Sequence, residues 1–218
     1  MFLSCPLACR SIQLPYLVHP FFTHNIPAWG LSVFSTSSYP VGMNLLPVLK
    51  TGKLIALCGA DSARAESMLL IAELGLRGPV TILDGGNRYQ PRRVALLLGR
   101  KTADIRTAAN RLFGRRAFTC YEMNTLLGTT PSLSYPCVIL DLLNTFYDDH
   151  VPIQEAERLL KSCLEQIQRL RLSAPVVVTL AQPLVGERAF LVERVCEKAD
   201  EVFVLDAPLP QVAQLALF

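Results

Sequence analysis

The sequence has 218 residues, 51% of them hydrophobic, which is enough to bury one substantial core. The formal net charge of +3 at pH 7 is too small to indicate a nucleic-acid-binding protein from bulk electrostatics alone. From the chain length we expect one globular domain. No run approaches the ~18 to 20 apolar residues of a membrane span, so we expect no membrane partner.

The N-terminal part differs from the rest. Residues 1–34 are predicted to form an extension and residues 35–218 the core domain, with a loop by composition at 34–42. Pro6, Arg10 and Pro15 interrupt the first apolar stretch, which argues against a secretory signal. Two alternatives stay open: a poorly ordered extension, or a start codon assigned upstream, since Met43 lies just before the first convincing element.

The cysteines indicate a reducing environment. The seven cysteines are an odd number, are scattered and form no CxxC pair, which argues against zinc ribbons and disulfide frameworks. We expect buried free thiols and an intracellular protein.

From residue 50 onward, short apolar runs alternate with helical patterns, which is typical of βαβ units. The predicted strands are 53–59, 79–86, 116–120, 136–143, 174–183 and 201–206. The predicted helices are 63–76, 90–100, 102–114 with Thr102 as N-cap, 121–129, 153–172 and 191–200. The fold class is therefore α/β, with a mostly parallel central sheet flanked by helices.

Ligands of such sheets bind at the carboxyl ends of the strands. This places Gly59 to Glu66, Asp84 and Asp141 along one edge of the molecule. The stretch "CGADSARAES" stands where a phosphate-binding loop with the pattern G-x-x-x-x-G-K-[ST] belongs. Counted from Gly59, however, the last three positions of that pattern are Arg64, Ala65 and Glu66.

Several stretches, in their order and spacing, resemble a known family. They are "ILDGGNRYQPRRV", "RRAFTCYEMNTLL", "STSSYPVGMNLLPVLKTGKLIALCG" and "VILDLLNTFY". Over about residues 35–206 the chain resembles the ATPase core of the RecA/RadA recombinases, especially the archaeal and eukaryotic branch. The resemblance implies a RecA-like, P-loop-type fold, and a location in the cytoplasm of a prokaryote or the nucleus of a eukaryote.

The residues that would carry the family's chemistry are altered. Gly59 matches the first glycine of the phosphate loop, but Arg64, Ala65 and Glu66 replace the second glycine, the lysine and the hydroxyl residue. Gly85 and Gly86 stand where the family has its catalytic glutamate, and glycine cannot accept a proton. We expect no catalysis and no cofactor, unless the altered loop still binds ATP and magnesium.

Some candidate residues remain. The vestigial nucleotide site would consist of Gly59, Ser62, Arg64 and Asp141, the residue that matches the Walker B aspartate. The alternative for Asp141 is a purely structural role, capping a neighbouring loop. Both DNA-contacting loops of the family are reduced here, and Asp148 and Asp149 make the first of them acidic.

A basic stretch is the one positive feature. It comprises Arg88, Arg92, Arg93, Arg100, Lys101, Arg106, Arg111, Arg115 and Arg116. It is either a solvated surface or a docking surface for DNA or an acidic partner, and salt-sensitive binding would distinguish the two.

The resemblance leads to one main hypothesis and two alternatives. The main one is a catalytically degenerate paralogue, an accessory protein in homologous recombination or DNA repair that contacts a RecA/RadA-type recombinase or another paralogue. The first alternative is an unconventional nucleotide-binding protein or weak DNA-dependent ATPase that uses Arg64 and Asp141. The second is an unrelated function on a similar fold.

Overall fold

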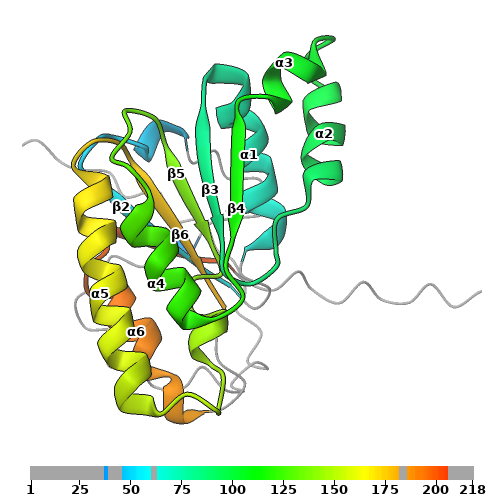
Figure 1. The fold of residues 1–218 in the computed structure, drawn as a ribbon. Helices are drawn as coiled ribbons and strands as arrows, with labels where there is room; N and C mark the ends of the chain where they lie inside the picture. The colour runs from blue at the N-terminus through cyan, green and yellow to red at the C-terminus, as the bar shows by residue number, and fades with distance from the viewer. Residues whose placement is uncertain (1–36, 39–45, 60–62, 182–185, 206–218) are drawn as a thin grey trace, which may run out of the picture. The chain divides into compact units, whose positions relative to one another are not determined.

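The computed structural model describes residues 37–38, 46–59, 63–181 and 186–205 (Figure 1). These residues all belong to a compact unit that spans 34–218. The predicted boundary at residue 34 lies outside the described residues and stays a prediction.

Strands and helices alternate along the described chain. The strands are β1 (Ser37–Ser38), β2 (Leu54–Gly59), β3 (Val80–Asp84), β4 (Leu112–Arg116), β5 (Cys137–Leu140), β6 (Val176–Leu180) and β7 (Glu201–Leu205). The α-helices are α1 (Arg64–Arg77), α2 (Pro91–Gly99), α3 (Ile105–Ala109), α4 (Cys120–Thr129), α5 (Ile153–Arg171) and α6 (Phe190–Cys196). Three 3₁₀ turns are η1 (Leu46–Val48), η2 (Asn144–Phe146) and η3 (Gly186–Arg188).

The strands form one sheet in the order β1-β7-β2-β6-β5-β3-β4. Every strand pair in it is parallel, which confirms the predicted α/β class with a parallel sheet. The longer central strands are almost continuously apolar because both of their faces are buried.

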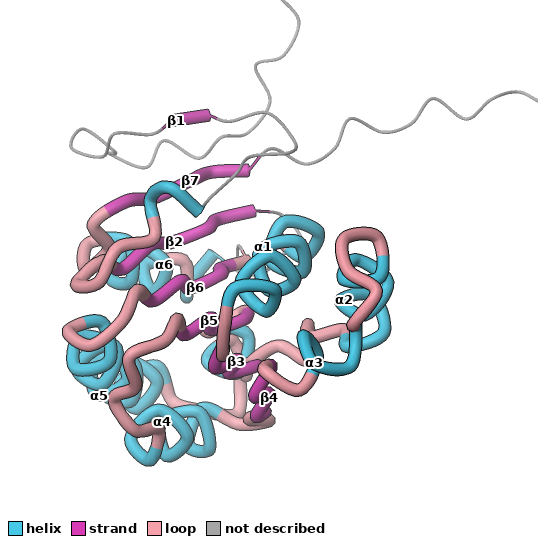
Figure 2. Tube along the Cα trace, turned by 90° about the horizontal axis from the view of Figure 1, so that it is seen from above, coloured by secondary structure: helices cyan, strands magenta, loops and turns pink. Residues whose placement is uncertain are grey.

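Helices cover the two faces of the sheet as separate layers (Figure 2). Leu54 and Ala56 of β2 pack into the core under α4, α5 and α6, whereas Ile55 and Leu57 pack into the core under α1, α2 and α3. This alternation follows from the two-residue period of a strand. The connections through α1 to α3 run toward β4 and those through α4 to α6 run back, so right-handed crossovers place the two groups on opposite faces.

This topology creates a switch point beside β2. From the carboxyl end of β2 the chain enters α1 on one face, and from its neighbour β6 the chain continues to α6 on the other. Ligand crevices of open α/β sheets lie at such points. The carboxyl ends of β2, β6, β5 and β3 are therefore where a functional site is expected.

One stretch of the sequence prediction was wrong. The helix predicted over 102–114 ends at Ala109, and the strand predicted over 116–120 is instead β4 at Leu112–Arg116. Register with β3, from Val80 opposite Leu112 to Asp84 opposite Arg116, determines the strand here. A non-local pairing has overridden a helical pattern in the local sequence. Asp104, which accepts a hydrogen bond from Thr107 N, caps α3 in place of the predicted Thr102.

A capping arrangement starts α4 where the sequence predicted a strand to end. Thr119 Oγ1 accepts from Glu122 N at 3.1 Å, and Glu122 Oε2 accepts from Phe118 N at 2.7 Å. Thr119→Ala should lower the free energy of unfolding by about 1 kcal/mol. Urea denaturation would measure it, and a loss no larger than that of exposed Thr107→Ala would contradict the capping role.

Candidate functional site

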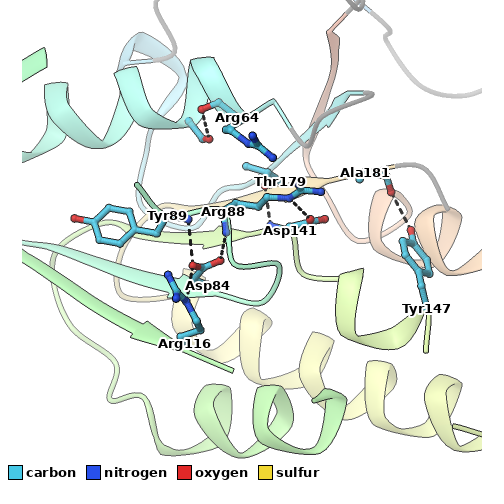
Figure 3. A network of polar contacts seen from close by, with 10 residues as sticks. Arg64, Asp84, Arg88, Tyr89, Arg116, Asp141, Tyr147, Thr179 and Ala181 are labelled. Carbon is cyan, nitrogen blue, oxygen red and sulfur yellow. Dashed lines mark hydrogen bonds and ion pairs between the residues drawn. The ribbon is translucent and has the colours of Figure 1, made fainter. Parts of the chain in front are cut away.

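The candidate site lies at the carboxyl ends of the strands, as the sequence predicted. Asp84 ends β3, Asp141 directly follows β5, and Gly59 ends β2. Arg64 begins α1, and its side chain points toward the part of the sheet edge where Arg88 and Asp141 lie (Figure 3). Ser62, the remaining candidate, lies outside the described residues.

Asp141 is held entirely within the protein. Its side chain is fully buried, and Oδ2 accepts a hydrogen bond and ion pair from Arg88 Nε at 2.8 Å. Its backbone N–H donates to Thr179 Oγ1 of β6 at 2.8 Å, and its φ of 50° lies in the left-handed region, which aspartate tolerates better than most residues. These contacts agree with the structural alternative, in which Asp141 fixes the neighbouring β3–α2 loop.

Asp84 organises the same loop from the other side. Its carboxylate accepts from the backbone N–H groups of Arg88 and Tyr89 at 2.8 and 3.1 Å, and from Arg116 Nε of β4 at 3.0 Å. Arg88 thus lies between two buried carboxylates, with its backbone bound to one and its side chain to the other (Figure 3). The loop after β3 is fixed on both sides.

The start of α1 is poorly suited to phosphate. A helix N-terminus attracts anions through its unpaired N–H groups and its dipole, but the first turn of α1 already carries the carboxylate of Glu66. A phosphate placed there would meet a like charge. Arg64 supplies a cation at this position but also a side chain where the loop pattern requires glycine.

Gly85 and Gly86 pack directly against Asp141. A Cβ at Gly85 would lie 3.0 Å from Asp141 O, and one at Gly86 would lie 2.6 Å from Asp141 Cγ. A side chain at Gly86 would therefore force Asp141 to move, and one at Gly85 would make a tight contact with backbone oxygens. A glutamate where the resemblance places it would disturb Asp141.

A divalent metal does not fit this arrangement either. The guanidinium of Arg88 already contacts Asp141, so a cation there would have to displace an ion pair from a buried position. The described residues contain no group of three or more His, Cys, Asp or Glu side chains that could hold a metal ion. We therefore derive no chemical step through magnesium or ATP.

Tyr147 lies next to the site, beyond Asp141 (Figure 3). Its hydroxyl donates to Ala181 O, one residue past β6, at 2.9 Å. Burial, and then the nearby charge of Asp141, raise the pKa of this phenol above its ordinary value, so it stays protonated as a donor. Tyr147, which follows η2, is thereby tied to the residue after β6.

The basic stretch does not form one uniform surface. Four of its nine members are bound within the protein: Arg88 to Asp141, Arg116 to Asp84, Lys101 to Glu73, and Arg111 to Leu76 O. The others are exposed and are distributed over or beside α2, α3 and β4: Arg92, Arg93, Arg100, Arg106 and Arg115. DNA binding by these five residues stays a prediction.

Sequence reasoning missed the partners of the two aspartates. It placed Arg88 and Arg116 in the basic stretch and in the stretches that carry the resemblance, and it assigned no role to Thr179 or Tyr147. The usable signal was an arginine four residues after a strand-ending aspartate, close enough to reach the neighbouring strand end.

No protein-family model matches the chain, and no curated protein matches it.

The five cysteines among the described residues are free, and all but the partly exposed Cys58 are buried, as predicted. In the part of the chain that the structure describes, no helix is both long and apolar enough to cross a membrane.

Proposed function

We propose that this protein is a catalytically degenerate member of the RecA/RadA-like group that works through protein contacts. In this proposal it is an accessory protein of homologous recombination or DNA repair, and its partner is a RecA/RadA-type recombinase or another paralogue. The motif order in the sequence and the parallel sheet support the proposal. The observation that carries it is a contrast between two parts of the sheet. At the carboxyl ends of the strands, where a nucleotide would bind, internal ion pairs occupy the aspartates, whereas the outer edge of β4 has no neighbouring strand in the described sheet.

β4 is the last strand in the order of the described sheet, so one of its edges presents N–H and C=O groups for pairing. Large apolar side chains lie on and just after it: Phe113 is 50% exposed, Phe118 71% and Tyr121 49%. Scattered exposed apolar residues are normal, but three aromatics within nine positions of one edge mark an interaction surface. We call Phe113, Phe118, Tyr121 and the free edge of β4 the edge surface.

A cavity of about 430 Å³ lies on the other face of β4. Its walls include Val94, Leu98, Leu112 and Tyr89, and Arg115 and Arg116 also line it. An extended segment of a partner that adds a strand to β4 could place an apolar side chain in this cavity. Strand addition gives affinity through the main chain and specificity through such pockets.

The test uses purified full-length protein and candidate recombinases in pull-down and calorimetry. Phe118→Asp should weaken binding by roughly thirtyfold or more, because a buried aromatic anchor contributes about 2 kcal/mol or more. Leu172→Asp is a matched control, since Leu172 is 73% exposed at the end of α5, and it should leave binding unchanged. A protein that binds no recombinase, or equal effects of the two variants, would refute the proposal.

A titration with a fluorescent ATP analogue, with and without magnesium, separates this function from the nucleotide-binding alternative. We expect no binding up to millimolar nucleotide, because Glu66 and the Arg88–Asp141 ion pair oppose phosphate and metal. Micromolar, magnesium-dependent binding that Arg64→Ala abolishes would instead favour the alternative.

A further inference from the structure

Two cysteines are in contact near the carboxyl end of β2, beside the switch point. Cys58 stands in β2 one residue before Gly59, and Cys196 is the last residue of α6. Their sulfurs are 3.9 Å apart and form a hydrogen bond, although 138 positions separate the residues in sequence. Both side chains contribute to the core under α4, α5 and α6. The site described above uses neither of them.

The surroundings of this pair differ from those of the other described thiols. Cys58 is partly exposed and its partner Cys196 is buried, whereas Cys137 and Cys163 are both buried in the core, where burial raises the pKa of each thiol to about 12. The hydrogen bond from Cys58 stabilises the thiolate of Cys196 and lowers its pKa, and the same contact raises the pKa of Cys58. A disulfide needs the sulfurs at about 2.05 Å, so the two sulfurs must approach each other by roughly 2 Å.

We propose that Cys58 and Cys196 form a redox site that a peroxide converts to a reversible intramolecular disulfide. The thiolate of one of the two cysteines attacks an oxygen of hydrogen peroxide, the O–O bond breaks, and the products are a sulfenic acid on that cysteine and a hydroxide that is protonated to water. The sulfur of the other cysteine, 3.9 Å away, then loses its proton and displaces the sulfenic hydroxyl, which leaves as a second water. The two thiols lose two electrons and two protons, and the peroxide is reduced to two waters.

The bond would join the end of a central strand to a helix on one face of the sheet. β2 lies between β7 and β6 and leads into the residues before α1, so the link restrains the carboxyl edge at the switch point. A cross-link across so long a stretch of chain restricts the unfolded state strongly. We therefore expect the oxidised protein to melt at a higher temperature than the reduced one. This inference does not depend on the proposed recombination function.

The test treats reduced full-length protein with hydrogen peroxide, alkylates the remaining thiols and digests with trypsin without reduction. The expected product joins the peptide LIALCGADSAR (54–64) to VCEK (195–198) with the loss of two hydrogens, and dithiothreitol separates them. Cys58→Ser and Cys196→Ala should each abolish the product, and Cys137→Ala should retain it. Mapping of the wild-type protein decides the question even if a variant fails to fold.

Two results would overturn the inference. One is a wild-type protein in which Cys58 stays fully alkylated after peroxide treatment. The other is a product that links Cys58 or Cys196 mainly to Cys5 or Cys9, because the 3.9 Å contact would then not be the reactive one.

Discussion

Arg88→Met is expected to lower the free energy of unfolding by about 3 kcal/mol, because it leaves Asp141 charged and buried without its cation. The Asp141 side chain is fully buried and that of Arg88 is 26% exposed, so water reaches the pair only at the Arg88 side chain. Asp141→Asn should cost less, since asparagine tolerates the φ of 50° and leaves Arg88 partly hydrated. Urea denaturation followed by circular dichroism would measure both changes.

The double variant gives the sharper result. Once Asp141 is neutral, removal of Arg88 should cost little, so Arg88→Met with Asp141→Asn should be clearly more stable than Arg88→Met alone. Arg92→Met is the matched control, because Arg92 is exposed near the start of α2 and its loss should change stability by about 0.5 kcal/mol or less. Equal losses of unfolding free energy from Arg88→Met and Arg92→Met would show that the ion pair does not contribute this stability.

Prediction from sequence succeeded for features that are local in the chain. Apolar runs predicted the strands that contain Leu54, Val80 and Val176, and parallel topology then placed Asp84 and Asp141 at one edge. The use of these aspartates was not predictable in the same way. Arg88 and Asp141 are 53 positions apart, and the place of Arg88 four residues after Asp84 is the only local sign that it could reach the neighbouring strand end.

The position of β4 was predicted wrongly for a related reason. Leu112, Phe113 and the residues before them fit a helical pattern, and only the neighbouring β3 makes this segment a strand. The difference matters for function, because β4 is the last strand in the order of the described sheet and carries the exposed Phe113. The edge surface therefore became visible only when long-range pairing was known.

Gly86→Glu, which places a carboxylate where the resemblance implies the catalytic glutamate, is expected to destabilise the protein without restoring ATP hydrolysis. A Cβ at this position would lie 2.5 Å from Asp141 Cβ and 2.6 Å from its Cγ, so Asp141 must move. Gly86→Ala alone should cost about 3 kcal/mol for overpacking, and glutamate adds a like charge beside a buried carboxylate. Denaturation midpoints and a phosphate-release assay would record the two effects.

A glycine in open space provides the control. Gly128 lies in α4, and a Cβ added to it would meet no atom of the described residues within 4 Å. Gly128→Ala should therefore leave stability unchanged or raise it by up to about 1 kcal/mol. If Gly86→Ala were as well tolerated as Gly128→Ala, the packing of Gly86 on Asp141 would not be what prevents a glutamate there. The edge would then be adaptable, and the expectation of no catalysis would rest on Ala65 and Glu66 alone. The expected contrast between the two glycines instead means that the Arg88–Asp141 ion pair and the glycines packed on it are one unit, so we expect no single substitution to introduce the chemistry that the resemblance implies.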